Sequence, residues 1–95
     1  ALAAEVKTAF EQALKDRDYW KATGNKAIMR RISALLSDIK AHPYTGIGKP
    51  EALKFDLQGK WSRRINSEHR IIYSVREDEE GMVVYIYSMR YHYRK

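Results

Sequence analysis

A repeating apolar stripe marks the clearest element of this sequence, between Lys26 and His42. Its apolar positions recur at the period of an amphipathic helix with one buried face, and they are Ile28, Ile32, Leu35, Leu36 and Ile39. Just before it, Gly24 suits the left-handed end of one helix and Asn25 the N-cap of the next. An earlier helix is therefore expected from about Gln12 to Thr23, and the two should form a helical hairpin.

The first ten residues are compatible with two structures. Val6, Thr8 and Phe10 alternate with other residues as they would in an edge strand. Residues 1–10 could equally extend the first helix, so a short N-terminal edge strand is one of two expectations here.

The pattern becomes strand-like in the C-terminal third. Segments 61–65, 70–75 and 82–89 are rich in aromatic and β-branched residues, and the polar residues between them are typical of hairpin turns. A loop is expected over 46–50, where glycines and a proline replace any period. The prediction is one α+β domain over residues 1–95, with an N-terminal αα-hairpin packed on a C-terminal antiparallel sheet whose other face is open.

Charge and composition restrict what such a domain can do. A formal charge of +6 favours a polyanionic partner, nucleic acid before acidic protein, although basic charge can also serve solubility alone. The chain has no cysteine, which excludes disulfides and thiolate chemistry, and its three histidines are not spaced as a metal site. We therefore expect neither metal nor cofactor. No segment approaches the roughly 20 apolar residues that span a bilayer, so no membrane association and a cytoplasmic location are expected.

Two arginines are predicted to face each other across the first hairpin. A turn centred on Ser67 would place Arg64 opposite Arg70, and two like charges in that position are destabilising unless an anion lies between them. A phosphate-binding surface is one interpretation. Acidic neighbours or a protein partner could also satisfy both charges.

The sequence also contains the parts needed to cleave RNA without a metal. In that reaction a base removes the proton of the 2′-OH and an acid protonates the leaving 5′-oxygen, here Glu51 and His92. Candidate cations for the phosphate are Lys49, Lys54, Arg64 and Arg70. Glu51 could instead stabilise the first turn of a helix after Pro50.

Three motifs in this order resemble the YoeB/Txe-type toxins of the RelE superfamily. They are GIGKPEALK (46–54), WSRRINSEHRIIY (61–73) and RYHY (90–93), and they follow the string DYW at 18–20. The resemblance covers most of the chain, from about Val6 to Tyr93. It implies a RelE-like microbial ribonuclease fold and the toxin component of a type II toxin–antitoxin system. Such a toxin is a ribosome-dependent, metal-independent endoribonuclease that inhibits translation by cutting mRNA in the A site, where 2′-OH attack leaves a 2′,3′-cyclic phosphate.

The resemblance also implies roles for individual residues. Matched by position, Glu51 is the general base, His92 the general acid, Arg70 the arginine that stabilises the phosphate, and Tyr93 the tyrosine that arranges the substrate. Further candidate RNA or phosphate contacts are Lys49, Lys54, Arg63, Arg64 and Arg90. The chain departs from the usual pattern in that two residues follow the RYHY tyrosine, which displaces the terminal carboxylate.

The partners implied are an acidic YefM/Axe-like antitoxin, the ribosome with its mRNA, and operator DNA only through the antitoxin. A homodimer is also implied, although an amphipathic helix packed on its own sheet predicts a monomer equally well. The alternative function is a non-catalytic basic module that binds RNA or an antitoxin. It would use the same surface without a working acid–base pair.

Overall fold

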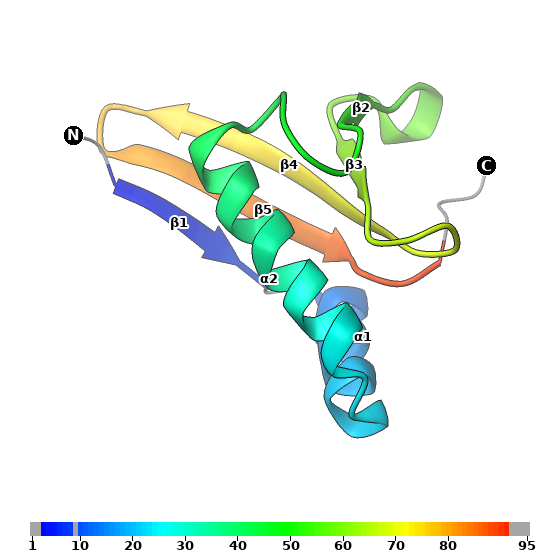
Figure 1. Cartoon of the computed structure of the whole chain (residues 1–95). Helices are drawn as coiled ribbons and strands as arrows, with labels where there is room; N and C mark the ends of the chain where they lie inside the picture. Colours follow the sequence, from blue (N-terminus) through cyan, green and yellow to red (C-terminus); the bar gives the residue numbers. More distant parts are fainter. Residues whose placement is uncertain (1–2, 9, 92–95) are drawn as a thin grey trace.

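The protein folds as two helices packed on a five-stranded mixed sheet, as Figure 1 shows for a computed structural model that describes residues 3–8 and 10–91. The helices are α1 (Glu11–Thr23) and α2 (Lys26–Ala41), with a short 3-10 helix, η1, at Phe55–Leu57. The sheet order is β1-β5-β4-β3-β2, and its strands are β1 (Ala3–Lys7), β2 (Glu51–Ala52), β3 (Trp61–Arg64), β4 (Arg70–Asp78) and β5 (Gly81–Ser88).

Helix α2 confirms the predicted apolar stripe. Its start is capped by Asn25, whose side chain accepts a hydrogen bond from the backbone N–H of Ile28 at 3.1 Å, and Gly24 takes the expected left-handed conformation with φ of 68°. Leu35 and Ile39 are fully buried in the core between helix and sheet, which they share with Ile71, Tyr73, Val84 and Ile86.

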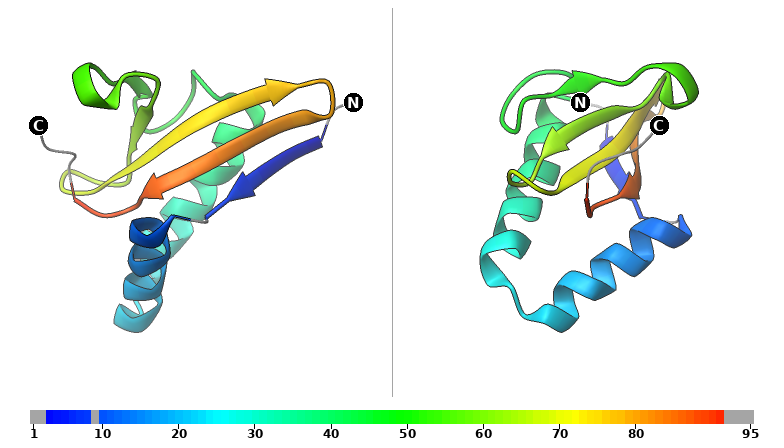
Figure 2. Two further views of the ribbon diagram at one scale, coloured as in Figure 1. Left: turned by 180° about the vertical axis from the view of Figure 1, so that it is seen from behind. Right: turned by 90° about the vertical axis from the view of Figure 1, so that its right-hand side faces the viewer.

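The helical hairpin is confirmed in connectivity, but its two arms diverge from the turn, as the right-hand view of Figure 2 shows. Helix α1 has no clear apolar stripe, and the residues that it buries are Ala13, Asp16 and Trp20. It packs against the end of β5. Its docking therefore depends on polar contacts as well as on apolar area.

The predicted meander is confirmed, and the sheet extends beyond it on both sides. Strands β3, β4 and β5 pair antiparallel, and Arg64 lies opposite Arg70 as expected. The N-terminal segment is an edge strand rather than an extension of α1. It pairs parallel to β5, which makes the sheet mixed. At the other edge β2 pairs Glu51 with Ser62, so Glu51 is in a strand and the alternative role at a helix start after Pro50 is wrong.

No helix within the described part of the chain is both long enough and apolar enough to cross a membrane.

Candidate active site

The strand register brings three of the predicted site residues to one face of the sheet. Side chains directly opposite each other in paired strands share a face, and so do residues two apart along a strand. Glu51 is opposite Ser62, two residues from Arg64, and Arg64 is opposite Arg70. Glu51 and Arg64 are therefore diagonal neighbours, with backbones about 7–8 Å apart, while the arginine pair is about 5 Å apart at Cβ.

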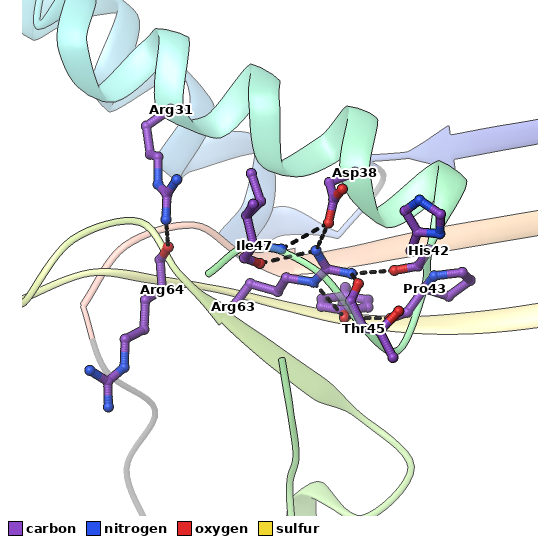
Figure 3. Close-up of polar contacts among 9 residues, drawn as sticks. Arg31, Asp38, His42, Pro43, Thr45, Ile47, Arg63 and Arg64 are labelled. Carbon is purple, nitrogen blue, oxygen red and sulfur yellow. Dashed lines mark hydrogen bonds and ion pairs between the residues drawn. The ribbon is translucent and has the colours of Figure 1, made fainter. Parts of the chain in front are cut away.

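This face is the one turned away from helix α2. Figure 3 shows the Arg64 side chain pointing away from the helix, while its neighbour Arg63 points toward Asp38 of α2. Glu51 and Arg64 are exposed and Arg70 is half-buried. The arrangement places a carboxylate and two arginines on one face of the sheet, where Glu51 and Arg64 are accessible and one terminal nitrogen of the Arg70 guanidinium is buried.

Lys49 and Lys54 flank Glu51, and both are exposed. Lys49 adopts a left-handed backbone with φ of 52°, and the carbonyl of Lys54 accepts the first hydrogen bond of η1. A hollow of about 410 Å³ lies where Lys49 and Arg64 meet Arg31 of α2, bordered by the turn residues Asn66 and Ser67. Three cationic side chains, those of Arg31, Lys49 and Arg64, therefore line this hollow.

The structure contradicts the phosphate contact predicted for Arg63. Its side chain is fully buried, and every nitrogen of its guanidinium donates within the protein. The acceptors are the Asp38 carboxylate, the Tyr73 hydroxyl and the backbone carbonyls of His42, Thr45 and Ile47. A guanidinium whose nitrogens are all engaged in this way cannot bind phosphate, so Arg63 instead ties β3 to α2 and the loop after it (Figure 3).

These contacts shift the pKa of two groups. The hydrogen bond from Arg63 holds the pKa of the Asp38 carboxyl below its ordinary value of 3.8, with help from the N–H of Ile47 and against a smaller effect of burial. Burial raises the pKa of the Tyr73 hydroxyl above 10.0, although its bond from Arg63 opposes this. The Tyr73 hydroxyl also donates to the Pro43 carbonyl at 2.7 Å.

Two glycines let the loop close over Arg63. A Cβ at Gly46 would overlap the Asp38 carboxylate, and a Cβ at Gly48 would lie 2.7 Å from Leu35 of α2. Gly48 also has φ of 80° and accepts a hydrogen bond from the N–H of Arg64. The glycine-rich loop therefore fixes the position of the backbone just before Lys49 and Glu51. The loop predicted over 46–50 is confirmed, since these residues form no helix or strand.

Arg90 lies on the side of the molecule formed by α1. Its guanidinium stacks 3.4 Å above the ring of Tyr19 and donates to the Tyr91 hydroxyl. The backbone next to it is joined to the candidate site, because the N–H of Arg70 donates to the carbonyl of Tyr91 at 3.2 Å. His92 and Tyr93, expected as general acid and substrate contact, lie outside the described residues.

Within residues 3–8 and 10–91, no group of three or more His, Asp or Glu side chains is placed to hold a metal ion. Sequence reasoning also missed Asp16, Trp20 and His69, which contact the segment after β5. No spacing in the sequence relates them to Met89 or Tyr91, and a lone histidine such as His69 carries no signal of its own.

Family models, sequence relatives and solved structures all place this chain in the same family. Residues 10–93 match the family model of the YoeB-like toxins of bacterial type II toxin–antitoxin systems. Toxin YoeB of Synechocystis sp. is 43% identical over 91 residues, which is 95% of this chain and 100% of that protein. Among solved structures, a YoeB/ParE toxin from Agrobacterium tumefaciens has a TM-score of 0.82 and 32% identity, covering 97% of this chain and 100% of that one.

Two structures from Staphylococcus aureus are also similar. A heterotetrameric YoeB–YefM toxin–antitoxin complex has a TM-score of 0.74 and 37% identity, covering 98% of this chain and 99% of that one. A YoeB dimer has a TM-score of 0.74 and 39% identity, covering 97% of this chain and 98% of that one.

Proposed function

Since the chain belongs to the family of YoeB-like toxins of bacterial type II toxin–antitoxin systems, we propose that it is an endoribonuclease that cuts messenger RNA in the A site of the ribosome. In the proposed reaction the 2′-oxygen of one nucleotide attacks the adjacent phosphorus and the bond to the 5′-oxygen breaks. The products are a 2′,3′-cyclic phosphate and a 5′-hydroxyl, and no metal takes part.

The observation that carries this proposal is the register of β2, β3 and β4. It gathers a carboxylate, Glu51, and two arginines, Arg64 and Arg70, on one accessible face of three neighbouring strands. Two guanidinium groups on opposite positions of paired strands concentrate positive charge, which favours a phosphate between them. A carboxylate near that phosphate could accept the proton of a 2′-OH.

Each residue then has a distinct role. Glu51 is the general base, and Arg70 stabilises the negative charge that develops on the phosphate oxygens. Arg64, Lys54 and Lys49 hold the RNA backbone around the reacting phosphate. His92 is the general acid that protonates the 5′-oxygen, since imidazole exchanges protons near neutral pH, and Tyr93 orients the substrate.

The same surface serves the proposed partners. A net charge of +6 suits both the ribosome and an acidic YefM/Axe-like antitoxin that neutralises the toxin, and operator DNA would be reached only through that antitoxin. The similar Staphylococcus aureus proteins form a YoeB–YefM complex and a YoeB dimer. We propose an antitoxin complex and a homodimer for this chain too.

The test is single-turnover cleavage of mRNA in the A site of purified ribosomes, with chemical mapping of the product ends. We expect cyclic phosphate ends from the wild type and loss of cleavage in a folded His92→Gln variant. Arg70→Ala should lower the rate about 10²–10³-fold, because it removes one donor to the developing charge.

The matched control is Arg76→Ala, an exposed arginine further along β4 that should leave the rate unchanged. An inactive wild type that still binds RNA or antitoxin would mean that the domain is a non-catalytic binding module.

A further inference from the structure

Helix α1 binds both backbone polar groups of Met89, the first residue after β5. The carboxylate of Asp16 accepts a hydrogen bond from the Met89 N–H at 2.8 Å, and the indole N–H of Trp20 donates to the Met89 carbonyl at 2.8 Å. Asp16 is 1% exposed and Trp20 is 5% exposed. Gln12 donates to the second Asp16 oxygen, so this buried carboxylate is held from both sides.

A histidine from the β3–β4 hairpin holds the chain two residues further on. The Nδ1 atom of His69 accepts a hydrogen bond from the Tyr91 N–H at 2.7 Å, and its ring packs edge-on against Trp20 with centroids 4.9 Å apart. Because Nδ1 accepts, a neutral His69 carries its proton on Nε2. Arg70 follows His69 and donates its own N–H to the Tyr91 carbonyl.

The segment 89–91 is therefore fixed residue by residue although it belongs to no strand. Met89 is bound by Asp16 and Trp20, Arg90 stacks on Tyr19 of α1, and Tyr91 is held by its backbone in a left-handed conformation with φ of 61°. A non-glycine residue keeps that conformation only where surrounding contacts determine it. The contacts that determine it here come from α1 and from the residues next to Arg70.

These contacts do more than pack the helix. Burying a carboxylate is costly unless its hydrogen bonds are satisfied, and an apolar residue would fill the same place on α1 without that cost. What the carboxylate and the indole N–H supply is direction, since each bond sets both the distance and the angle of the backbone group it reaches. The direction in question is that of the chain as it passes Arg70.

We propose that Asp16, Trp20 and His69 are positioning residues for RNA cleavage. They hold Met89 to Tyr91 beside Arg70, and so set the point and the direction from which the chain continues into His92 and Tyr93. The proposal rests on the nuclease function proposed above, and it assigns to α1 a part in a reaction whose described groups, Glu51, Arg64 and Arg70, belong to the sheet.

Three substitutions separate positioning from packing. Trp20→Phe removes the indole donor and keeps an aromatic ring. His69→Phe keeps the ring between Trp20 and Tyr91 and removes the acceptor. His69→Asn restores an acceptor, because its amide oxygen takes the place of Nδ1. Val75→Ala, in β4 away from the hairpin turn, is the control for general loss of stability.

The measurements are amide hydrogen exchange at Met89 and Tyr91, thermal unfolding, and steady-state kcat and KM for cleavage on programmed ribosomes. We expect Trp20→Phe and His69→Phe to stay folded, to speed exchange at these amides, and to lower kcat about 10- to 100-fold with little change in KM, since misplacing a reacting group by about 1 Å has an effect of this size. His69→Asn should recover most of the rate, and Val75→Ala should keep it.

Two results would overturn the positioning role while leaving the nuclease intact. One is an unchanged kcat in variants whose Tyr91 amide exchanges faster. The other is an equal fall in kcat in Val75→Ala at equal loss of stability. A wild type that does not cleave at all would instead refute the nuclease function, and the positioning role with it.

Discussion

Two adjacent arginines in the same motif have opposite roles because neighbouring residues of a strand point to opposite faces. Arg63 is fully buried against α2 and its charge is neutralised by Asp38, while Arg64 is exposed on the other face. A buried charge is tolerated only when it is paired and its hydrogen bonds are satisfied, and all the nitrogens of Arg63 are used in this way. Arg63 is therefore a structural residue, and Arg64 is available to a ligand.

The pair offers a matched test of these roles. Arg63→Ala should lower the free energy of unfolding by about 1–3 kcal/mol, since it leaves three loop carbonyls and the Asp38 carboxylate without their donor. Arg64→Ala should change it by less than about 0.5 kcal/mol, as surface substitutions usually do. Urea denaturation measures both. Equal losses of stability in the two variants would show that the burial of Arg63 contributes nothing specific.

At the scale of elements, the loop between α2 and β2 is held by three structural units at once. Asp38 comes from α2, Arg63 from β3 and Tyr73 from β4, and the loop carbonyls lie among them. Gly46 and Gly48 allow the close approach. These contacts, which we call the Arg63 junction, fix the position of the backbone just before Lys49 and Glu51. The candidate site therefore depends on contacts made on the opposite face of the sheet.

The shifted pKa values of two groups in the Arg63 junction, Asp38 and Tyr73, predict how stability depends on pH. The pKa of Asp38 is lowered in the folded state, so its contribution is complete above the ordinary value of 3.8 and is lost as the pH falls below it. The pKa of Tyr73 is raised, so its contribution is complete below 10.0 and is lost as the pH rises above it. Between these limits neither group should change the stability.

Urea midpoints measured from acid to alkaline pH would check this. Asp38→Asn should flatten the acid side of the profile alone, and Tyr73→Phe the alkaline side alone. If both variants keep the slopes of the wild type, the two groups are not the source of the pH dependence.

The whole molecule divides its functions between its two faces. The helices cover one face of the sheet and bury the core, and the other face carries Glu51, Arg64 and Arg70. The chain has a net charge of +6, and part of that charge lines the hollow beside Arg64. Charge concentrated around this hollow should bind RNA locally, whereas charge spread over the surface would attract it without preference.

Salt dependence distinguishes these cases. For single-stranded RNA the slope of log K against log salt is negative and should become less steep by about 0.7 for each phosphate that the protein no longer neutralises, so Arg64→Ala should reduce its magnitude by about that amount. Lys40→Ala, an exposed lysine in the last turn of α2, should leave the slope unchanged. Fluorescence anisotropy across a salt series gives both values, and equal slopes in the two variants would argue for diffuse attraction.

The sequence by itself determined the parts of this protein that depend on near neighbours. The apolar stripe predicted α2, the turn residues predicted the β3–β4 hairpin, and the short turn set the register that pairs Arg64 with Arg70. Only the tertiary structure decided which side of β3 is buried, that Glu51 lies in β2, that β1 is parallel to β5, and that Asp16 reaches Met89, 73 positions away. The roles of Glu51, Arg70, His92 and Tyr93 stay predictions. Periodicity describes one element at a time, whereas the features that only the tertiary structure decided depend on how distant segments pack together.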